Sequence, residues 1–245
     1  MKKIILLIFP ILLNVYLCFK NLAHNKPLKF VSKRWNFNSR FSYKLGESKS
    51  IDLANDIKEN DLIPNVKVMV DVGNIGNVNS YGEEERKSPD DKSPFRSIDT
   101  HELFKSKRIL LISLPGAFTP LCTSKMIPEY EKEYDNFIIE NKFDDIYCIT
   151  NNDIYVLKSW FKDMGIKKIK YISDGNSSFT ESMNMLVDKS NYFMGMRPWR
   201  YVAIVENNIL IKIFQENEKQ HNIQTDPYDI SSANHVKEFL KHNKI

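Results

Sequence analysis

Cys122 is the residue whose type and position most clearly suggest chemistry in this sequence. It ends the segment PGAFTPLC, which begins at Pro115 between an apolar run and a stretch with helical spacing. In α/β proteins, functional sites often lie where the carboxyl end of a strand leads into a helix. A cysteine at a helix N-terminus faces unpaired backbone N–H groups and the positive end of the helix dipole, and both favour the thiolate. Cys122 is therefore a candidate nucleophile, although position and spacing alone are equally compatible with a small buried packing residue.

The strands that must position Cys122 are predicted from the apolar pattern. The run ILLISL, from Ile109 to Leu114, has the length and continuous apolar character of a buried central strand. Two further apolar runs at 200–205 and 209–214 are separated by Glu206-Asn207-Asn208, which predicts a hairpin because asparagine tolerates positive φ. Other strands are expected at residues 66–72, 144–150 and 170–173.

Helices are predicted between these strands. A long amphipathic helix follows Cys122, and Pro128 should kink it because proline lacks a backbone N–H. Asn152 or Asp153 should cap the next helix, which Gly165 should end. Shorter helices are expected at 98–104, after a capping box of Ser178 and Glu181, and after a cap at Ser231 or Ser232. The alternation of strands and helices predicts an α/β fold with a central mixed β-sheet flanked by helices.

Composition and charge limit the classes of function. With 42% hydrophobic and 27% charged residues among 245, the chain is long enough for one globular domain, assigned to residues 56–245 with a polar insertion near 73–96. Residues 1–50 hold ten Lys and Arg but one acid, Glu47, which leaves 25 basic and 30 acidic residues of the totals of 35 and 31. A mildly acidic domain argues against nucleic acid as a partner.

The first residues have the composition of targeting segments. Lys2 and Lys3 precede a mainly apolar run from Ile4 to Cys18, so residues 1–22 are predicted to be a signal peptide. An uncleaved anchor is the alternative, because no clear small-x-small cleavage site follows. Residues 23–55 are basic and have the composition of an organelle transit peptide.

The two segments together resemble the bipartite leader that directs proteins into a secondary plastid such as the apicoplast. The alternatives are the secretory pathway and the mitochondrion. Removal of the leader would leave a mature form without a membrane segment.

Three cysteines cannot build a disulfide scaffold, and with five scattered histidines they give no zinc-binding spacing. The sequence also contains no phosphate-binding loop, so neither a metal nor another cofactor is expected.

PGAFTPLC, together with Pro128-Glu129-Tyr130, resembles the active-site signature of the peroxiredoxins, in which Pro, Thr and Cys follow the pattern P-x-x-x-T-x-x-C. The complete PGAFTP motif, Asn152-Asp153 and the segment 196–201 (MRPWRY) are more similar to the type-five subgroup. The resemblance covers residues 57–245 apart from the insertion. It implies a thioredoxin-like fold, which agrees with the predicted order of elements.

The resemblance also implies roles for single residues. Cys122 would be the peroxidatic nucleophile, and Thr119 would hold the thiolate and the peroxide. Arg200 would be the cation beside the sulfur, with Arg197 as a competing candidate. The residues expected to form the substrate pocket are Pro115, Gly116 and Phe118. Two positions depart from the subgroup, because Met126 replaces a usual histidine and Glu129 a usual glycine.

The activity that the resemblance implies is thiol-dependent reduction of hydrogen peroxide, alkyl hydroperoxides or peroxynitrite in antioxidant defence. Cys122 would become a sulfenic acid. Cys148 lies in the middle of a predicted strand and is therefore expected to be a packing thiol. Residues 215–230, where atypical two-cysteine members of the family place a resolving cysteine, contain none. We therefore expect a one-cysteine mechanism in which glutathione, a glutaredoxin or a thioredoxin is the external reductant. A homodimer is also expected.

Two alternatives come from other classes of protein. The chain could be a catalytically inactive thioredoxin-fold module for binding or chaperone activity, with Met126 and Glu129 as signs of lost turnover. It could also be an interaction protein tethered to a membrane by its first 18 residues.

Overall fold

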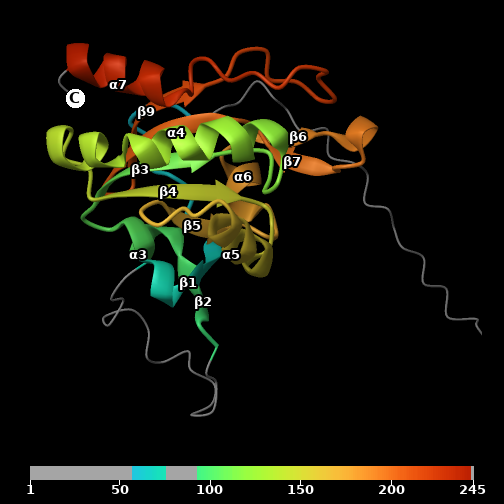
Figure 1. The fold of residues 1–245 in the computed structure, drawn as a ribbon, viewed down its shortest axis with the longest axis horizontal. Coiled ribbons are helices and arrows are strands. Elements are labelled where there is room, and N and C mark those ends of the chain that lie inside the picture. Colours follow the sequence, from blue (N-terminus) through green and yellow to red (C-terminus); the bar gives the residue numbers. More distant parts are fainter. Residues whose placement is uncertain (1–56, 76–92, 244–245) are drawn as a thin grey trace, which may run out of the picture. The chain divides into compact units, whose positions relative to one another are not determined.

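The computed structural model describes residues 57–75 and 93–243, so the targeting segments and most of the predicted insertion lie outside the described residues. Seven strands form a mixed sheet in the order β2-β1-β5-β4-β3-β8-β9, shown in Figure 1. The strands are β1 (Lys67–Asp71), β2 (Phe95–Asp99), β3 (Arg108–Ser113), β4 (Asp145–Thr150), β5 (Lys170–Ser173), β8 (Tyr201–Glu206) and β9 (Ile209–Gln215). A separate antiparallel pair consists of β6 (Leu186–Asp188) and β7 (Met196–Pro198).

The helical elements connect these strands. They are α2 (Val72–Ile75), α3 (Thr100–Phe104), the π-helical turn η2 (Cys122–Met126), α4 (Ile127–Lys132), η3 (Asn136–Glu140), α5 (Ile154–Asp163), α6 (Ser178–Ser182), the 3₁₀ turn η4 (Ser190–Tyr192) and α7 (Ala233–His242). Among the described residues, no helix is long and apolar enough to cross a membrane.

The sheet is mixed because its central connections are of two kinds. Strands β3, β4 and β5 run parallel and are joined by helical crossovers, whereas β1 is antiparallel to β5 and β8 is antiparallel to β3. Hairpin β8–β9 turns through Asn207 and Asn208, whose φ angles are 48° and 69°. The predicted hairpin is therefore confirmed, and asparagine supplies the positive φ that its turn requires.

Both faces of the sheet are covered by helices. Consecutive residues of a strand point to opposite sides, so each strand contributes side chains to both layers of the core. On one face, Leu110, Ile112 and Cys148 pack with side chains from η2, α4, α5 and α7. On the other face, Ile109 and Leu111 pack with side chains from α3 and α6. The predicted α/β architecture, a central mixed sheet flanked by helices in a thioredoxin-like fold, is confirmed.

The helix after Cys122 begins with a π-helical turn. The backbone N–H of Ile127 donates to the carbonyl of Cys122, five residues earlier. Pro128 follows within the first turn of α4 and has no N–H to continue the regular pattern. The irregularity that Pro128 was expected to cause therefore lies at the start of the helix, next to Cys122.

Helix α5 has the boundaries that the sequence predicts. Asp153 Oδ1 accepts hydrogen bonds from the backbone N–H groups of Tyr155 and Val156, both at 3.0 Å. Gly165 follows the helix with a φ of +69°, a conformation that glycine adopts without a Cβ penalty. Of the two candidate caps, Asp153 is therefore the one used.

Two local predictions are wrong. Strand β2 begins in the segment that was predicted to be an insertion. Its sequence FRSID has no clear alternation, and the strand forms at the edge of the sheet because it pairs with β1. Ser178 does not form a capping box, since it lies inside α6. The Asp174 carboxylate instead accepts the backbone N–H groups of Phe179 and Thr180, at 3.0 and 2.8 Å.

Candidate active site

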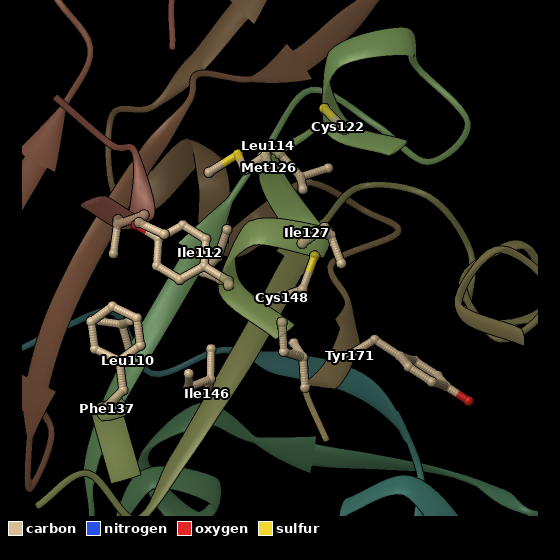
Figure 2. Close-up of a cluster of buried hydrophobic side chains, with 14 of the residues drawn as sticks. Leu110, Ile112, Leu114, Cys122, Met126, Ile127, Phe137, Ile146, Cys148 and Tyr171 are labelled. Atoms are coloured by element: carbon tan, nitrogen blue, oxygen red, sulfur yellow. The ribbon is translucent and has the colours of Figure 1, made fainter. Parts of the chain in front are cut away.

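Cys122 is the first residue of η2 and is completely buried. It follows the loop that leaves β3, so the structure places it where a strand end leads into a helical segment, as predicted. The next backbone N–H, that of Thr123, donates to the carbonyl of Thr119 at 3.0 Å. Figure 2 shows the Cys122 sulfur at the edge of the apolar cluster that includes Leu114 and Met126.

Arg200 lies beside this sulfur, although 78 positions separate the two residues in sequence. Its Nη1 is 3.4 Å from Cys122 Sγ, and its Nη2 is 2.6 Å from Asp226 Oδ1. The side chain of Arg200 is only 1% exposed. A buried guanidinium is therefore held between the candidate nucleophile and one carboxylate.

Strand pairing explains why Arg200 reaches this position. In the antiparallel register of β3 and β8, Ser113 is opposite Tyr201, so Arg200 lies level with the end of β3. The hydroxyl of Ser113 donates to the Trp199 carbonyl at 3.3 Å, and the Glu216 N–H donates to the Arg200 carbonyl at 3.2 Å. These bonds fix the backbone on both sides of the guanidinium.

The surroundings of Arg200 favour its charge. Burial opposes a charged guanidinium, but the negative charges of Cys122 and Asp226 outweigh it and raise the pKa of Arg200 above its ordinary value. The guanidinium carbon also lies 5.9 Å from the centre of the Tyr228 ring. Its Nε has no hydrogen-bond partner among the described residues.

Met126 and Glu129, the two positions that depart from the type-five subgroup, lie near this cation. Met126 Sδ is 3.0 Å from Arg200 Nη1, which is the same nitrogen that faces Cys122. Glu129 Oε2 accepts a 2.6 Å hydrogen bond from the Tyr228 hydroxyl. The two residues thus have defined partners in the site region.

Arg197, the competing candidate for the cation beside Cys122, lies elsewhere. Its Nε donates to the Met194 carbonyl at 2.8 Å and its Nη1 is 3.4 Å from Asn151 Oδ1. Of the two candidates, Arg200 is the arginine that contacts the Cys122 sulfur.

Thr119 and Pro115 line a pocket next to the site. The pocket has a volume of about 210 Å³ and is lined by Pro115, Thr119, Pro120, Lys189, Tyr192, Met194, Ile223, Gln224, Thr225 and Asp226. The Thr119 hydroxyl donates to the Gly116 carbonyl at 2.8 Å, which leaves its oxygen lone pairs available as acceptors. The predicted role of Thr119 in holding thiolate and peroxide stays a prediction.

Gly116 and Phe118 do not line this pocket. A Cβ on Gly116 would lie 3.1 Å from Asn152 Oδ1, the atom that accepts the Ala117 N–H at 2.8 Å, so glycine permits a close approach there. Phe118 has a φ of 59°, is 53% exposed, and its ring centre lies 6.4 Å from that of Trp160. Both residues therefore shape the loop around the pocket.

Cys148 occupies the middle of β4, with Ile112 and Tyr171 opposite it on the neighbouring strands. It is completely buried, and both described cysteines are free. Burial, followed by the negative charge of Cys122, raises the pKa of the Cys148 thiol well above its usual value. Cys148 is thus a packing thiol, as Figure 2 illustrates.

Asp226 and Lys189 are pocket residues that the sequence alone did not indicate. Both lie in connecting segments whose spacing follows neither a helical nor a strand period. The sequence shows that one residue is acidic and the other basic, but it contains no motif or spacing that connects either of them with Cys122.

Comparisons with known proteins agree with the geometry. A family model described as Redoxin matches residues 58–236. A peroxiredoxin of Rhizobium etli is 42% identical over 151 residues, which cover 61% of this chain and 84% of the relative.

Two solved structures extend this similarity. The crystal structure of the Plasmodium falciparum antioxidant protein, described as a 1-Cys peroxiredoxin, is 75% identical, covers 76% of this chain and 100% of its own, and gives a TM-score of 0.69. That of peroxiredoxin 5 from Alvinella pompejana is 25% identical, covers 76% of this chain and 99% of its own, and gives a TM-score of 0.57. The alternative of an inactive module is not supported, and the chain belongs to the peroxiredoxin family of thiol peroxidases.

Proposed function

We propose that this chain reduces hydrogen peroxide, alkyl hydroperoxides or peroxynitrite through a sulfenic acid on Cys122, in antioxidant defence. The observation that carries the proposal is the 3.4 Å distance between Arg200 Nη1 and the Cys122 sulfur. A permanently charged guanidinium at hydrogen-bond distance stabilises the thiolate, which is the nucleophilic form of cysteine.

In the proposed reaction, the thiolate attacks one oxygen of the peroxide. A sulfur–oxygen bond forms while the oxygen–oxygen bond breaks. The departing oxygen takes a proton to leave as water or an alcohol, and with peroxynitrite the leaving group is nitrite. Arg200 offers a positive charge where negative charge develops, and Thr119 would orient the peroxide. The product on the chain is a sulfenic acid.

The pocket beside the site supports more than one peroxide substrate. Tyr192, Met194 and Ile223 give its wall an apolar part, which suits the alkyl group of an organic hydroperoxide. Because Cys122 is completely buried, we propose that the loop that carries Thr119 opens to admit a peroxide to the sulfur. Access through this loop is part of the proposal.

Regeneration is proposed to use an external thiol. Cys148 is buried within a strand, and residues 215–230 contain no cysteine that could resolve the sulfenic acid. The 1-Cys description of the 75% identical relative supports the same mechanism. We assign the reductant to glutathione, a glutaredoxin or a thioredoxin.

The subgroup and the assembly are also proposals. The complete PGAFTP motif and the similarity to a relative named peroxiredoxin 5 support the type-five subgroup. A homodimer would agree with the resemblance, and sedimentation of residues 56–245 would test it.

Residues 1–55 are proposed to be a signal peptide followed by a transit peptide that directs the chain to a plastid. The Redoxin match begins at residue 58, which supports separating this segment from the catalytic domain. A fluorescent protein fused to residues 1–55 should enter the plastid in an organism that has one. Location in the mitochondrion or release by secretion would contradict the proposal.

The proposed nucleophile is tested by a pair of matched cysteine variants. Cys122→Ser should abolish rapid consumption of hydrogen peroxide, because a serine hydroxyl is not ionised at neutral pH. Cys148→Ser, in the same buried cluster, should retain the rate of the unmodified protein. Equal activity of Cys122→Ser and the parent chain would overturn the assignment.

A further inference from the structure

Glu216 is a buried carboxylate outside the lining of the substrate pocket. It directly follows β9 and is only 2% exposed. Its Oε1 accepts hydrogen bonds from the backbone N–H groups of Asp229 and Ser231, both at 2.8 Å, and from the Ser231 hydroxyl at 2.7 Å. A buried carboxylate is unfavourable unless donors surround it, and three donors meet that condition. Glu216 therefore ties the end of β9 to residues 229–231.

Helix α4 holds the same part of the chain, which belongs to the connection between β9 and α7 (Figure 1). The Tyr130 hydroxyl donates to the Ser231 carbonyl at 2.8 Å, and the Tyr228 hydroxyl donates to Glu129 Oε2 at 2.6 Å. Helix α4 directly follows η2, the turn that begins with the nucleophile. These bonds therefore join the connection to the helical segment of the active site.

The connection also carries Asp226, the carboxylate that pairs with Arg200. We call residues 226–231 the strap. Pro227 and Tyr228 alone separate Asp226 from the residues that Glu216 holds, and the proline ring fixes one backbone dihedral angle of this short link. The position of the strap backbone therefore determines where the Asp226 carboxylate lies.

The backbone of Glu216 contacts the other member of this ion pair. Its N–H donates to the Arg200 carbonyl at 3.2 Å, and its carbonyl accepts the Trp199 Nε1–H at 2.9 Å. The main chain of Glu216 thus fixes the residue that carries the guanidinium, while its side chain fixes the strap that carries the carboxylate. Both partners of the Arg200–Asp226 pair are positioned by one residue.

We propose that Glu216 is a positioning residue for peroxide reduction, whose carboxylate acts through Asp226 on the guanidinium of Arg200. This inference rests on the proposed function and adds to it a residue that does not line the pocket. Glu216 holds the strap, and the strap presents Asp226 Oδ1 at 2.6 Å from Arg200 Nη2. With Nη2 held in this way, Nη1 of the same guanidinium lies 3.4 Å from the Cys122 sulfur.

A purely structural role is the alternative, and Asp174 offers the matched comparison. Asp174 is likewise 2% exposed and lies outside the lining of the pocket. Its carboxylate accepts the N–H groups of Phe179 and Thr180 at 3.0 and 2.8 Å and the Thr180 hydroxyl at 2.7 Å. Loss of either carboxylate removes two bonds from backbone N–H groups and one from a hydroxyl, but Asp174 has no link to the strap.

Single substitutions separate the two roles. Glu216→Ala should lower the second-order rate constant for hydrogen peroxide about threefold to tenfold, the range expected when Asp226 itself loses its charge. Glu216→Gln keeps an oxygen that can accept the three donors and should stay within about twofold of the parent chain. Asp174→Ala should lower the midpoint of urea unfolding to a similar extent as Glu216→Ala but change the rate constant less than about twofold.

A double-mutant cycle tests whether Glu216 acts through Asp226. The rate constants of Glu216→Ala, Asp226→Asn and the double variant are measured by stopped-flow fluorescence. If both residues act on Arg200 by one route, the double variant should lie within about twofold of the slower single variant. Independent effects would instead multiply, to a loss of about tenfold to a hundredfold.

A milder pair of variants covers the case in which Glu216→Ala does not fold. Ser231→Ala removes the hydroxyl donor to Glu216, and Thr180→Val removes the hydroxyl donor to Asp174, each from a bond of 2.7 Å. Ser231→Ala should lower the rate constant about twofold to threefold, and this loss should disappear when Asp226→Asn is already present. Thr180→Val should leave the rate constant unchanged.

Losses that multiply in the cycle would overturn the inference, and so would an unchanged rate constant in both Glu216→Ala and Ser231→Ala. Equal losses of rate in Glu216→Ala and Asp174→Ala would trace the effect to stability and would also overturn it. A parent chain that does not consume hydrogen peroxide would instead contradict the proposed function, so the two failures are distinguishable.

Discussion

Arg200 and Asp226 form an ion pair of 2.6 Å that orients the guanidinium beside the buried Cys122 sulfur. The arginine is almost completely buried, whereas the Asp226 side chain is 42% exposed. The carboxylate therefore links the interior of the site to the pocket wall. Its removal should loosen the cation without removing the charge.

Asp226→Asn should lower the second-order rate constant for hydrogen peroxide about threefold to tenfold. The amide keeps the shape of the side chain but weakens a charge-assisted hydrogen bond, and the exposure of Asp226 limits the effect. Stopped-flow fluorescence under pseudo-first-order conditions measures the change. Asp229→Asn is the control at a nearby acidic residue. The backbone N–H of Asp229 donates the hydrogen bond to Glu216 Oε1, so this substitution leaves that bond in place. An unchanged rate in Asp226→Asn would contradict an orienting role.

Arg200→Gln should lower the same rate constant about a hundredfold, because it removes the charge that stabilises the thiolate and the developing anion. The rate at which iodoacetamide alkylates Cys122 should fall as well. Arg197→Gln is the matched control, as Arg197 contacts Met194 and Asn151 instead. Similar losses in the two variants would show that the effect is structural.

Met126→Leu tests whether the thioether, which shares Arg200 Nη1 with Cys122, weakens the contact between this nitrogen and the Cys122 sulfur. Leucine has a similar volume and no acceptor, so Arg200 Nη1 would be left to the Cys122 sulfur alone. We expect a larger second-order rate constant for hydrogen peroxide, with a change in unfolding free energy of less than about 1.5 kcal/mol. Stopped-flow fluorescence measures the rate constant and urea unfolding measures the free energy. A smaller rate constant in Met126→Leu would contradict an effect of the thioether on the Cys122 contact.

Asp71 gives a pH-dependent contribution to stability far from the site. Burial raises its pKa, but hydrogen bonds from Lys158, Tyr171 and the Gly73 N–H outweigh this, and the pKa lies below its ordinary value. A carboxyl with a lowered pKa stabilises the fold above its unfolded-state pKa and loses that contribution as pH falls through the folded-state value.

Asp71→Asn should therefore destabilise the chain by about 1 kcal/mol at pH 7 and by less at pH 3. Urea unfolding at the two pH values measures the difference between the variant and the parent chain. A difference that grows on acidification would contradict the direction of the shift.

Local rules account for the elements that the sequence predicted correctly. Strand β3 is a continuous apolar run, Asp153 caps α5, and Asn207-Asn208 forms the hairpin turn, so each signal lies within a few residues. Strand β2 depends on pairing with β1, about 30 positions earlier, and its own sequence has no period. Such an element is visible only once its partner is known.

The candidate site divides in the same way. Cys122 was recognisable from its place between a strand and a helix, and the peroxiredoxin resemblance pointed to Arg200. Their contact follows from the register of β3 and β8, which brings residues 78 positions apart together. Lys189 and Asp226 could not be predicted, because irregular segments carry them to the pocket.

The most direct test of the account is mass spectrometry of the protein after one equivalent of hydrogen peroxide in the presence of dimedone, which traps sulfenic acids. We predict a dimedone adduct on Cys122 and an unmodified Cys148, in keeping with one reactive sulfur and one buried packing thiol. A disulfide between Cys122 and Cys148 as the main product would contradict the one-cysteine mechanism, and an adduct on Cys148 alone would contradict Cys122 as the nucleophile.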